Sequence, residues 1–152
     1  MDSFLRAQEW NKLAEKDLKS AEVLIKDLEL IENTCYHCQQ AAEKYLKGYL
    51  VMHRKNPTKT HDLNFLCNEC IIINDNFKQI RDYCSDLTVY AIQTRYPWHI
   101  EVTERDMRDA LSNVKIIQNF VHTLAPEMIH GDKPQSKPKQ DYRDLFAMVP
   151  MR

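Results

Sequence analysis

The polar side of residues 35–50 holds the side chains of this chain that are best suited to chemistry. Amide, carboxylate and ammonium groups gather there at three- and four-residue steps, which is the spacing of one face of a helix. These residues are Gln39, Gln40, Glu43, Lys44 and Lys47. Amides and ammonium groups hydrogen-bond phosphate oxygens, so we expect this polar side to contact a phosphate of a nucleotide or of RNA.

Asp17 lies in another predicted helix, at the border of its apolar stripe. A carboxylate at the edge of a core needs a partner, because an unpaired charge in a low-dielectric region is very unfavourable. Arg95, Lys44 or the amides of Gln39 and Gln40 would supply that partner. Two interpretations stay open: a structural polar cluster that fixes the register of the helices, or a pocket that binds a nucleotide or RNA phosphate.

Positive charge concentrates toward the end of the helix that contains residues 35–50 and in the residues that follow it. The cations are Lys44, Lys47, Arg54, Lys55 and Lys59, with His53 and His61 beside them. One interpretation is compensation of the helix dipole on a solvated face. The other is a local phosphate-contact patch, which even a chain of net charge -1 can form.

Arg95 and His99 are the pair that would carry a reaction. They are the two ends of the sequence Arg95-Tyr-Pro-Trp-His99. A guanidinium group matches phosphate geometry and keeps its charge at all ordinary pH values. If the chain cleaves RNA, Arg95 stabilises the negatively charged phosphorane, His99 transfers protons, and no metal is required. The alternative is that Arg95 bonds the carbonyls of the next loop or Asp17.

Two Cys-x-x-Cys pairs, Cys35/Cys38 and Cys67/Cys70, have a spacing that zinc sites also use. However, 28 residues separate the two pairs, which is more than the about 12 to 20 residues of common zinc sites. Both pairs also fall in apolar stripes, where cysteine behaves as a small apolar residue. We therefore expect these cysteines in the core, together with Tyr45, which falls in the same apolar stripe as Cys35 and Cys38. We predict no metal site.

Apolar periodicity predicts the elements that hold these residues. Four long helices and one short helix, which Thr60 is expected to cap, are predicted, and the long ones cover about 4–28, 33–54, 77–95 and 103–124. Asn33 or Thr34 is the expected cap of the second helix, and Thr103 with Asp106 forms a capping box at the last. Long amphipathic helices with short connections form an antiparallel up-and-down bundle, so the predicted fold class is all-α.

Residues 1–125 are expected to form this bundle, and residues 126–152 a tail that contains proline and lysine. The chain has two glycines, which argues against a β-rich fold. One of them, Gly48, lies mid-helix at a cost of about 1 kcal/mol, so we expect another helix to cross closely there. No apolar run reaches the about 18 residues of a membrane span, and cysteines at apolar positions favour a reduced, cytoplasmic protein.

Three motifs occur in order along the chain, and together they resemble the HEPN domain family from about Trp10 to Leu124. The motifs are His37-Cys-Gln-Gln-Ala-Ala-Glu-Lys-Tyr-Leu-Lys47, Thr60-His-Asp-Leu63 and Arg95-Tyr-Pro97. The resemblance implies a helical bundle that binds a nucleotide or RNA, is commonly a homodimer and needs no cofactor. It also implies pairing with a minimal nucleotidyltransferase in a toxin–antitoxin-like system.

Other members of that family are metal-independent endoribonucleases with an arginine followed by a histidine at a dimer interface. Here three residues separate Arg95 from His99, which is shorter than the family spacing, and Pro97 lies between them. We therefore keep three alternatives: a nucleotide- or RNA-binding module, an endoribonuclease toxin that uses Arg95 and His99, and a purely structural dimerising subunit.

Overall fold

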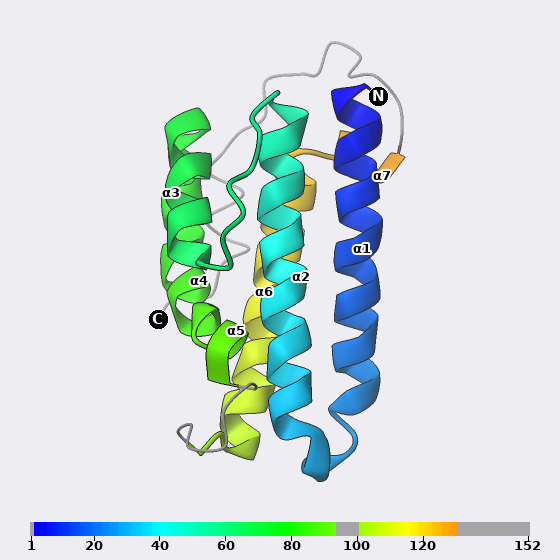
Figure 1. The fold of residues 1–152 in the computed structure, drawn as a ribbon, viewed down its shortest axis with the longest axis vertical. Helices are drawn as coiled ribbons and strands as arrows, with labels where there is room; N and C mark the ends of the chain where they lie inside the picture. Colours follow the sequence, from blue (N-terminus) through cyan, green and yellow to red (C-terminus); the bar gives the residue numbers. More distant parts are fainter. Residues whose placement is uncertain (1, 94–100, 131–152) are drawn as a thin grey trace.

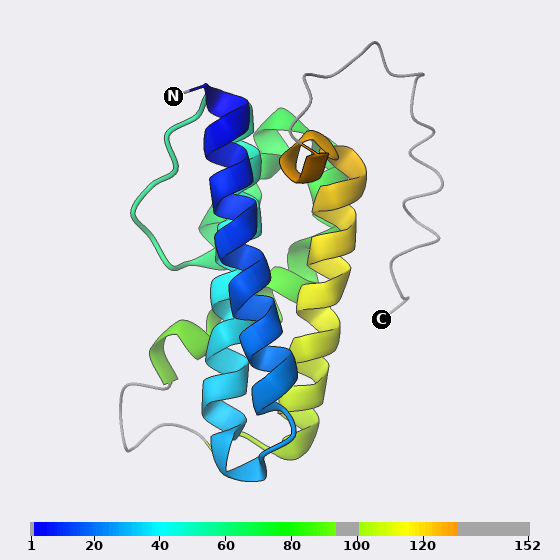
Figure 2. The ribbon, with the colours of Figure 1, turned by 90° about the vertical axis from the view of Figure 1, so that its right-hand side faces the viewer.

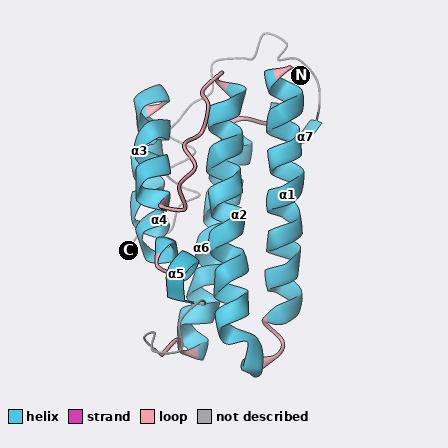
Figure 3. Cartoon of the chain, in the orientation of Figure 1, coloured by secondary structure: helices cyan, strands magenta, loops and turns pink. Residues whose placement is uncertain are grey.

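The computed structural model describes residues 2–93 and 101–130, and every regular element in these two ranges is helical (Figure 3). The predicted all-α fold is therefore confirmed. The elements are α1 (Ser3–Leu24), η1 (Leu28–Leu30), α2 (Ile31–Met52), α3 (Leu63–Ile73), η2 (Asp75–Ile80), α4 (Arg81–Thr88), α5 (Tyr90–Gln93), α6 (Glu104–Leu124) and α7 (Glu127–His130).

The helices stand side by side, and α1, α2, the pair α4 and α5, and α6 alternate in direction as expected for an up-and-down bundle (Figure 1). The helix α2 lies at the centre, with α1 on one side and α6 behind it. The chain then returns along α2 through residues 53–62 before α3 begins, so the short helix α3 runs parallel to α2. The pair α4 and α5 occupies the place that one long helix was expected to fill.

Small side chains bring α1 and α2 close together, as the mid-helix glycine predicted. The face of α1 toward α2 is lined by buried Ala7, Ala14 and Ala21. A Cβ atom at Gly48 would lie 3.1 Å from Trp10 Cβ and 3.4 Å from the carbonyl oxygen of Ala7. The expected close crossing at Gly48 is therefore confirmed, and α1 is the helix that makes it.

Two of the expected helix starts differ from the structure, and one agrees. Thr103 and Asp106 form the reciprocal capping box at the start of α6. At α3, the side chain of Asp62 rather than Thr60 accepts the first backbone N–H groups. Thr34 lies inside α2, where its hydroxyl donates to the carbonyl of Leu30 at 2.9 Å, because α2 begins two residues earlier than expected.

The expected continuous helix over about 77–95 is divided in the structure. The side chain of Asn74 accepts from the N–H of Asn76 at 3.0 Å and starts the 3-10 segment η2. A regular α-helix begins only at Arg81, and a second break separates α4 from α5. The apolar seam predicted for this segment is nevertheless buried, with Phe77, Ile80, Cys84, Leu87 and Ala91 all in the core.

The bundle continues past the boundary that we expected at residue 125. The short helix α7 lies between the ends of α1 and α6 (Figure 2). Met128 is 1% exposed, and the amide of Gln8 on α1 donates to the carbonyl oxygen of Glu127 at 3.1 Å. The helical packing therefore extends to His130, and the rest of the predicted tail lies outside the described residues.

Among the described helices, none is both long enough and apolar enough to span a bilayer.

Candidate functional site

Asp17 on α1 takes Lys44 of α2 as its partner, one of the partners expected for it. The ammonium group of Lys44 donates to one carboxylate oxygen of Asp17. The ring Nδ1 of His37, about two turns earlier on α2, lies 2.9 Å from the other oxygen. The Asp17 side chain is 13% exposed, so solvent screens this pair less than a surface pair. Asp17, His37 and Lys44 thus tie α1 to α2, and we call them the α1–α2 ion cluster.

A second polar cluster lies on α2 under the chain segment 53–62. Glu43 is 5% exposed and lies 3.2 Å from the ammonium of Lys47 and 2.8 Å from Nδ1 of His61. The amide of Gln39 donates to the carbonyl oxygen of His61 at 2.9 Å. Because Gln39, Glu43 and Lys47 are four residues apart, they line one face of α2 beneath this segment. We call these three residues and His61 the loop-covered cluster.

Gln40, the neighbour of Gln39 on α2, bonds to the loop-covered cluster. Its amide group donates to the side-chain oxygen of Gln39 at 2.8 Å. Lys47 is 7% exposed, and its ammonium group lies 5.8 Å from the centre of the Trp10 ring. All five predicted residues of this side of α2 therefore have protein partners, and each of the lysines Lys44 and Lys47 has its own carboxylate. Their charges are largely neutralised within the fold.

Of the basic patch predicted at the end of α2, the cations that are exposed lie in the segment 53–62. Arg54, Lys55 and Lys59 are exposed, and none forms an ion pair within residues 2–93 and 101–130. Arg54 has φ of 62°, the left-handed conformation that commonly ends a helix. The next N–H, of Lys55, donates to the carbonyl of Leu50 at 2.9 Å. We call Arg54, Lys55 and Lys59 the loop cations; the sequence indicated them, but as part of a patch with Lys44 and Lys47.

A third polar cluster joins α1, α2 and α6, and sequence reasoning missed it. The carboxylate of Glu15 accepts from the hydroxyl of Tyr45 at 2.8 Å and from the amide of Gln118 at 2.9 Å. The ring of His122 lies 2.7 Å from the side-chain oxygen of Asn11. Burial lowers the pKa of His122 below its usual value, despite the nearby Glu15. No local pattern marks these residues, because the two ends of the cluster are about a hundred positions apart in sequence.

The cysteines and Tyr45 lie in the core, as the sequence predicted. Cys35, Cys38, Cys67, Cys70 and Tyr45 are all fully buried. Burial raises the pKa of the Cys35 thiol to about 12, with smaller contributions from Asp106 and Glu32. Cys67 differs, because a hydrogen bond with Cys84 lowers its pKa. Across residues 2–93 and 101–130, no three His, Cys, Asp or Glu side chains are placed to hold one metal ion.

Arg95 and His99 lie outside the described residues. The described chain reaches Gln93 at the end of α5 and resumes before Thr103, which caps α6. The expected contact between Arg95 and the polar side of α2, and the catalytic role of the pair, therefore stay predictions.

Comparisons with known proteins agree with the fold. The model of the HEPN domain family matches residues 7–124. Among solved structures, TT1696 from Thermus thermophilus is similar, with 26% sequence identity, a TM-score of 0.66, and coverage of 81% of this chain and 98% of that chain. ST0689, an archaeal HEPN homologue, has 26% identity and a TM-score of 0.63 over 78% of this chain and 96% of its own. No curated protein matches the sequence.

Proposed function

The chain belongs to the HEPN domain family, and from this premise we propose that it binds RNA or a nucleotide through phosphate contacts of the loop cations. The supporting observation is that Arg54, Lys55 and Lys59 are exposed without a counter-charge in the described ranges. Exposed Arg and Lys gain binding energy from phosphates mainly by releasing the counterions of the nucleic acid. The lysines of α2, in contrast, already have carboxylate partners.

The loop-covered cluster supports this proposal because it holds the cation-bearing segment against α2. The segment is bonded at its far end by His61, through both its ring and its carbonyl oxygen. At its near end the Lys55 N–H is bonded to Leu50. Cations on a segment held at both ends lose less conformational entropy on binding than cations on a free tail.

The same proposal includes a homodimer and a minimal nucleotidyltransferase as the partner protein, as family resemblance implies. Co-expression with a nucleotidyltransferase from a neighbouring gene, followed by co-purification and mass measurement, tests both. A monomer that copurifies with nothing would contradict this part of the proposal.

Neutralising the loop cations is expected to weaken RNA binding about tenfold or more at low salt. The test is the triple variant Arg54→Asn, Lys55→Gln and Lys59→Gln. Asparagine is chosen at position 54 because it tolerates the left-handed conformation. Three lost phosphate contacts are expected to reduce the slope of log affinity against log salt by about 2 for single-stranded RNA. Fluorescence anisotropy with a labelled RNA at several salt concentrations measures both quantities.

A matched control removes three exposed cations elsewhere, at Lys12, Lys26 and Lys115. It changes the net charge equally, so it should leave the salt slope near that of the unaltered protein. Equal effects of the two triple variants would mean that only overall charge matters and would contradict the assigned surface. Absence of binding of ATP and of short RNA by the unaltered protein at low salt would favour the purely structural subunit.

The endoribonuclease is the second candidate, because Arg95 and His99 follow one another closely in a family that includes ribonucleases. On this alternative, the purified protein degrades RNA in the presence of EDTA, and Arg95→Ala and His99→Ala each reduce the rate by at least about a hundredfold. Gel analysis of a labelled RNA with time checks this result. Degradation that both substitutions leave unchanged would rule out this mechanism.

A further inference from the structure

A pocket of about 330 Å³ lies at the end of α2 where the loop cations begin, and its size suits a small ligand. Its walls come from the ends of α1, α2, α6 and α7, and from Asn74 between α3 and η2. His53, which also lines the pocket, directly precedes Arg54 in the chain. A molecule whose phosphate contacts Arg54 can therefore place its other end in this pocket.

Aromatic side chains give the pocket surfaces on which a flat ring can stack. Phe4 is half-buried, Tyr49 is 3% exposed, and the centre of the His53 ring lies 4.5 Å from that of Tyr49. Burial lowers the pKa of His53 below its usual value, despite the nearby Glu127, so this ring is mainly uncharged at pH 7. The pocket thus offers neutral aromatic surfaces, which proteins use to stack nucleobases.

Glu127 determines which end of a nucleotide suits the pocket. It is 8% exposed, and a buried carboxylate repels a phosphate but accepts N–H groups. A carboxylate accepts up to about four hydrogen bonds, so Glu127 can accept from a ligand in addition to its interactions within the protein. A nucleotide would therefore leave its phosphate with the loop cations and place its base, which carries N–H groups, inside.

Asn74 adds a hydrogen-bond donor to the same pocket. Its side-chain oxygen accepts from the backbone N–H and from the side-chain amide of Asn76, each at 3.0 Å. Because these bonds engage the oxygen, the amide nitrogen of Asn74 is the group that can donate to a ligand. Guanine carries the acceptor O6 beside the two donors N1–H and N2–H on one edge. An amide nitrogen and a carboxylate together complement this edge.

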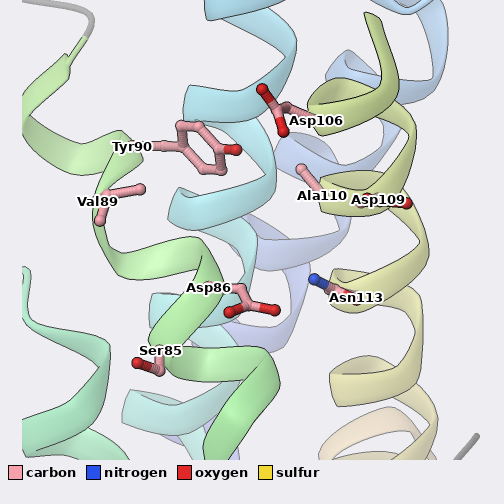
Figure 4. Close-up of a pocket in the computed structure, with 8 residues that line it drawn as sticks. All are labelled: Ser85, Asp86, Val89, Tyr90, Asp106, Asp109, Ala110 and Asn113. Carbon is pink, nitrogen blue, oxygen red and sulfur yellow. The ribbon is translucent and has the colours of Figure 1, made fainter. Parts of the chain in front are cut away.

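The larger cleft between α4, α5 and α6, of about 480 Å³, does not suit a nucleotide that the loop cations hold. Figure 4 shows Asp86 on one side of it and Asp106 and Asp109 on the other. Three carboxylates repel a phosphate. The cleft also lies in the half of the bundle opposite to the end of α2 where the loop cations begin (Figure 1).

We propose that the pocket at the end of α2 holds the base of the bound nucleotide and prefers guanine. The base stacks on Phe4, donates N1–H and N2–H to Glu127, and accepts from Asn74 through O6. This inference rests on the proposed function, in which the loop cations contact the phosphate. It also goes beyond the family match, which covers residues 7–124, because Phe4 and Glu127 lie outside that range.

Calorimetric titration of the full chain with GMP, AMP, CMP and UMP at low salt tests the proposal. GMP should bind about tenfold more tightly than the others, and Glu127→Gln should remove this preference, because it replaces an acceptor oxygen with a donor. Phe4→Leu keeps an apolar side chain without a ring, and should weaken binding of all four nucleotides about fivefold. The control Glu22→Gln removes an exposed carboxylate from α1 and should change neither affinity nor preference.

A titration with guanosine separates this inference from the proposed function. Guanosine has no phosphate, so the triple variant of the loop cations should bind guanosine as the unaltered protein does, although it binds GMP more weakly. If the triple variant keeps full affinity for GMP while Glu127→Gln loses the guanine preference, the phosphate contacts are wrong and the base pocket stands.

Three results would overturn the base pocket. Equal affinity for the four nucleotides, weakened by the triple variant, would leave the phosphate contacts alone. A guanine preference that Glu127→Gln retains, with an unaltered circular dichroism spectrum, would place the base elsewhere; if that spectrum changes, unchanged affinities in Phe4→Leu have the same meaning. The third result is that the unaltered protein binds neither GMP nor guanosine.

Discussion

Replacing Gly48 with leucine is expected to lower the free energy of unfolding by about 3 kcal/mol. The position is mid-helix in α2, where Trp10 Cβ and the backbone of Ala7 on α1 already lie within 3.4 Å of an added Cβ. A leucine side chain has no space there unless α1 moves away from α2. Urea denaturation measures the change, and the melting temperature should fall by about 10 °C.

Gly48→Ala is the control for this prediction, because it separates helix propensity from space. Alanine gains about 1 kcal/mol of helix propensity over glycine. Its methyl group would lie 2.6 Å from the terminal methyl of Met128, which is the flexible end of a side chain and can turn away. The two effects oppose each other, so Gly48→Ala should change stability by less than about 1 kcal/mol. A leucine variant as stable as the alanine variant would show that α1 and α2 are not in close contact.

The sequence predicted the fold correctly where one helix has an apolar pattern of its own. The apolar stripe of α2 and the capping box at Thr103 are local patterns, and the structure confirms both. The prediction of a continuous helix over 77–95 was wrong, because the Asn74 side chain stabilises a tighter 3-10 turn at its start. The packing of Met128 was not predicted, because the four residues of α7 are too few to show a helical period of apolar residues.

The sequence predicted which residues form the candidate site, but not which groups these residues bond to. The sequence placed Gln39, Glu43 and Lys47 on one face of a helix, as the structure does. It could not show that residues 53–62 fold back over that face, because the path of a loop depends on tertiary contacts. The sequence therefore indicated His61 as a basic residue and as part of the second motif, but not that its ring and carbonyl oxygen both bond to α2.

The observed pairing gives the polar side of α2 a structural role of its own. Asp17 and Lys44 connect α1 with α2, and Glu43 with His61 connects α2 with the returning loop. Partnered charges of this kind favour one register of the helices over another, since a shift of one turn would leave them unpaired in a low-dielectric region. The same side of α2 can support binding indirectly, by fixing the segment that carries the loop cations.

Replacing Glu43 with leucine is the second change with a large expected effect. Leucine has a similar volume and accepts no hydrogen bond, so the ammonium of Lys47, which is 7% exposed, would lose its carboxylate. Removing one partner of a buried ion pair costs about 3 kcal/mol, and urea denaturation should show a loss of that size. Glu104→Gln breaks an exposed pair with Arg108, whose side chain is 65% exposed, and should cost less than about 1 kcal/mol.

The double variant Glu43→Leu with Lys47→Met distinguishes the charge from the loop attachment. Removing both charges should restore most of the lost stability, because apolar replacement of a buried pair is often neutral. It does not restore the contact of Glu43 with His61, so amide hydrogen exchange in residues 53–62 should stay faster than in the unaltered protein. If the double variant stays as unstable as Glu43→Leu, the loss arises from packing or from the loop rather than from an uncompensated ammonium group. If it recovers both stability and slow exchange, the interaction of Glu43 with His61 does not hold the loop.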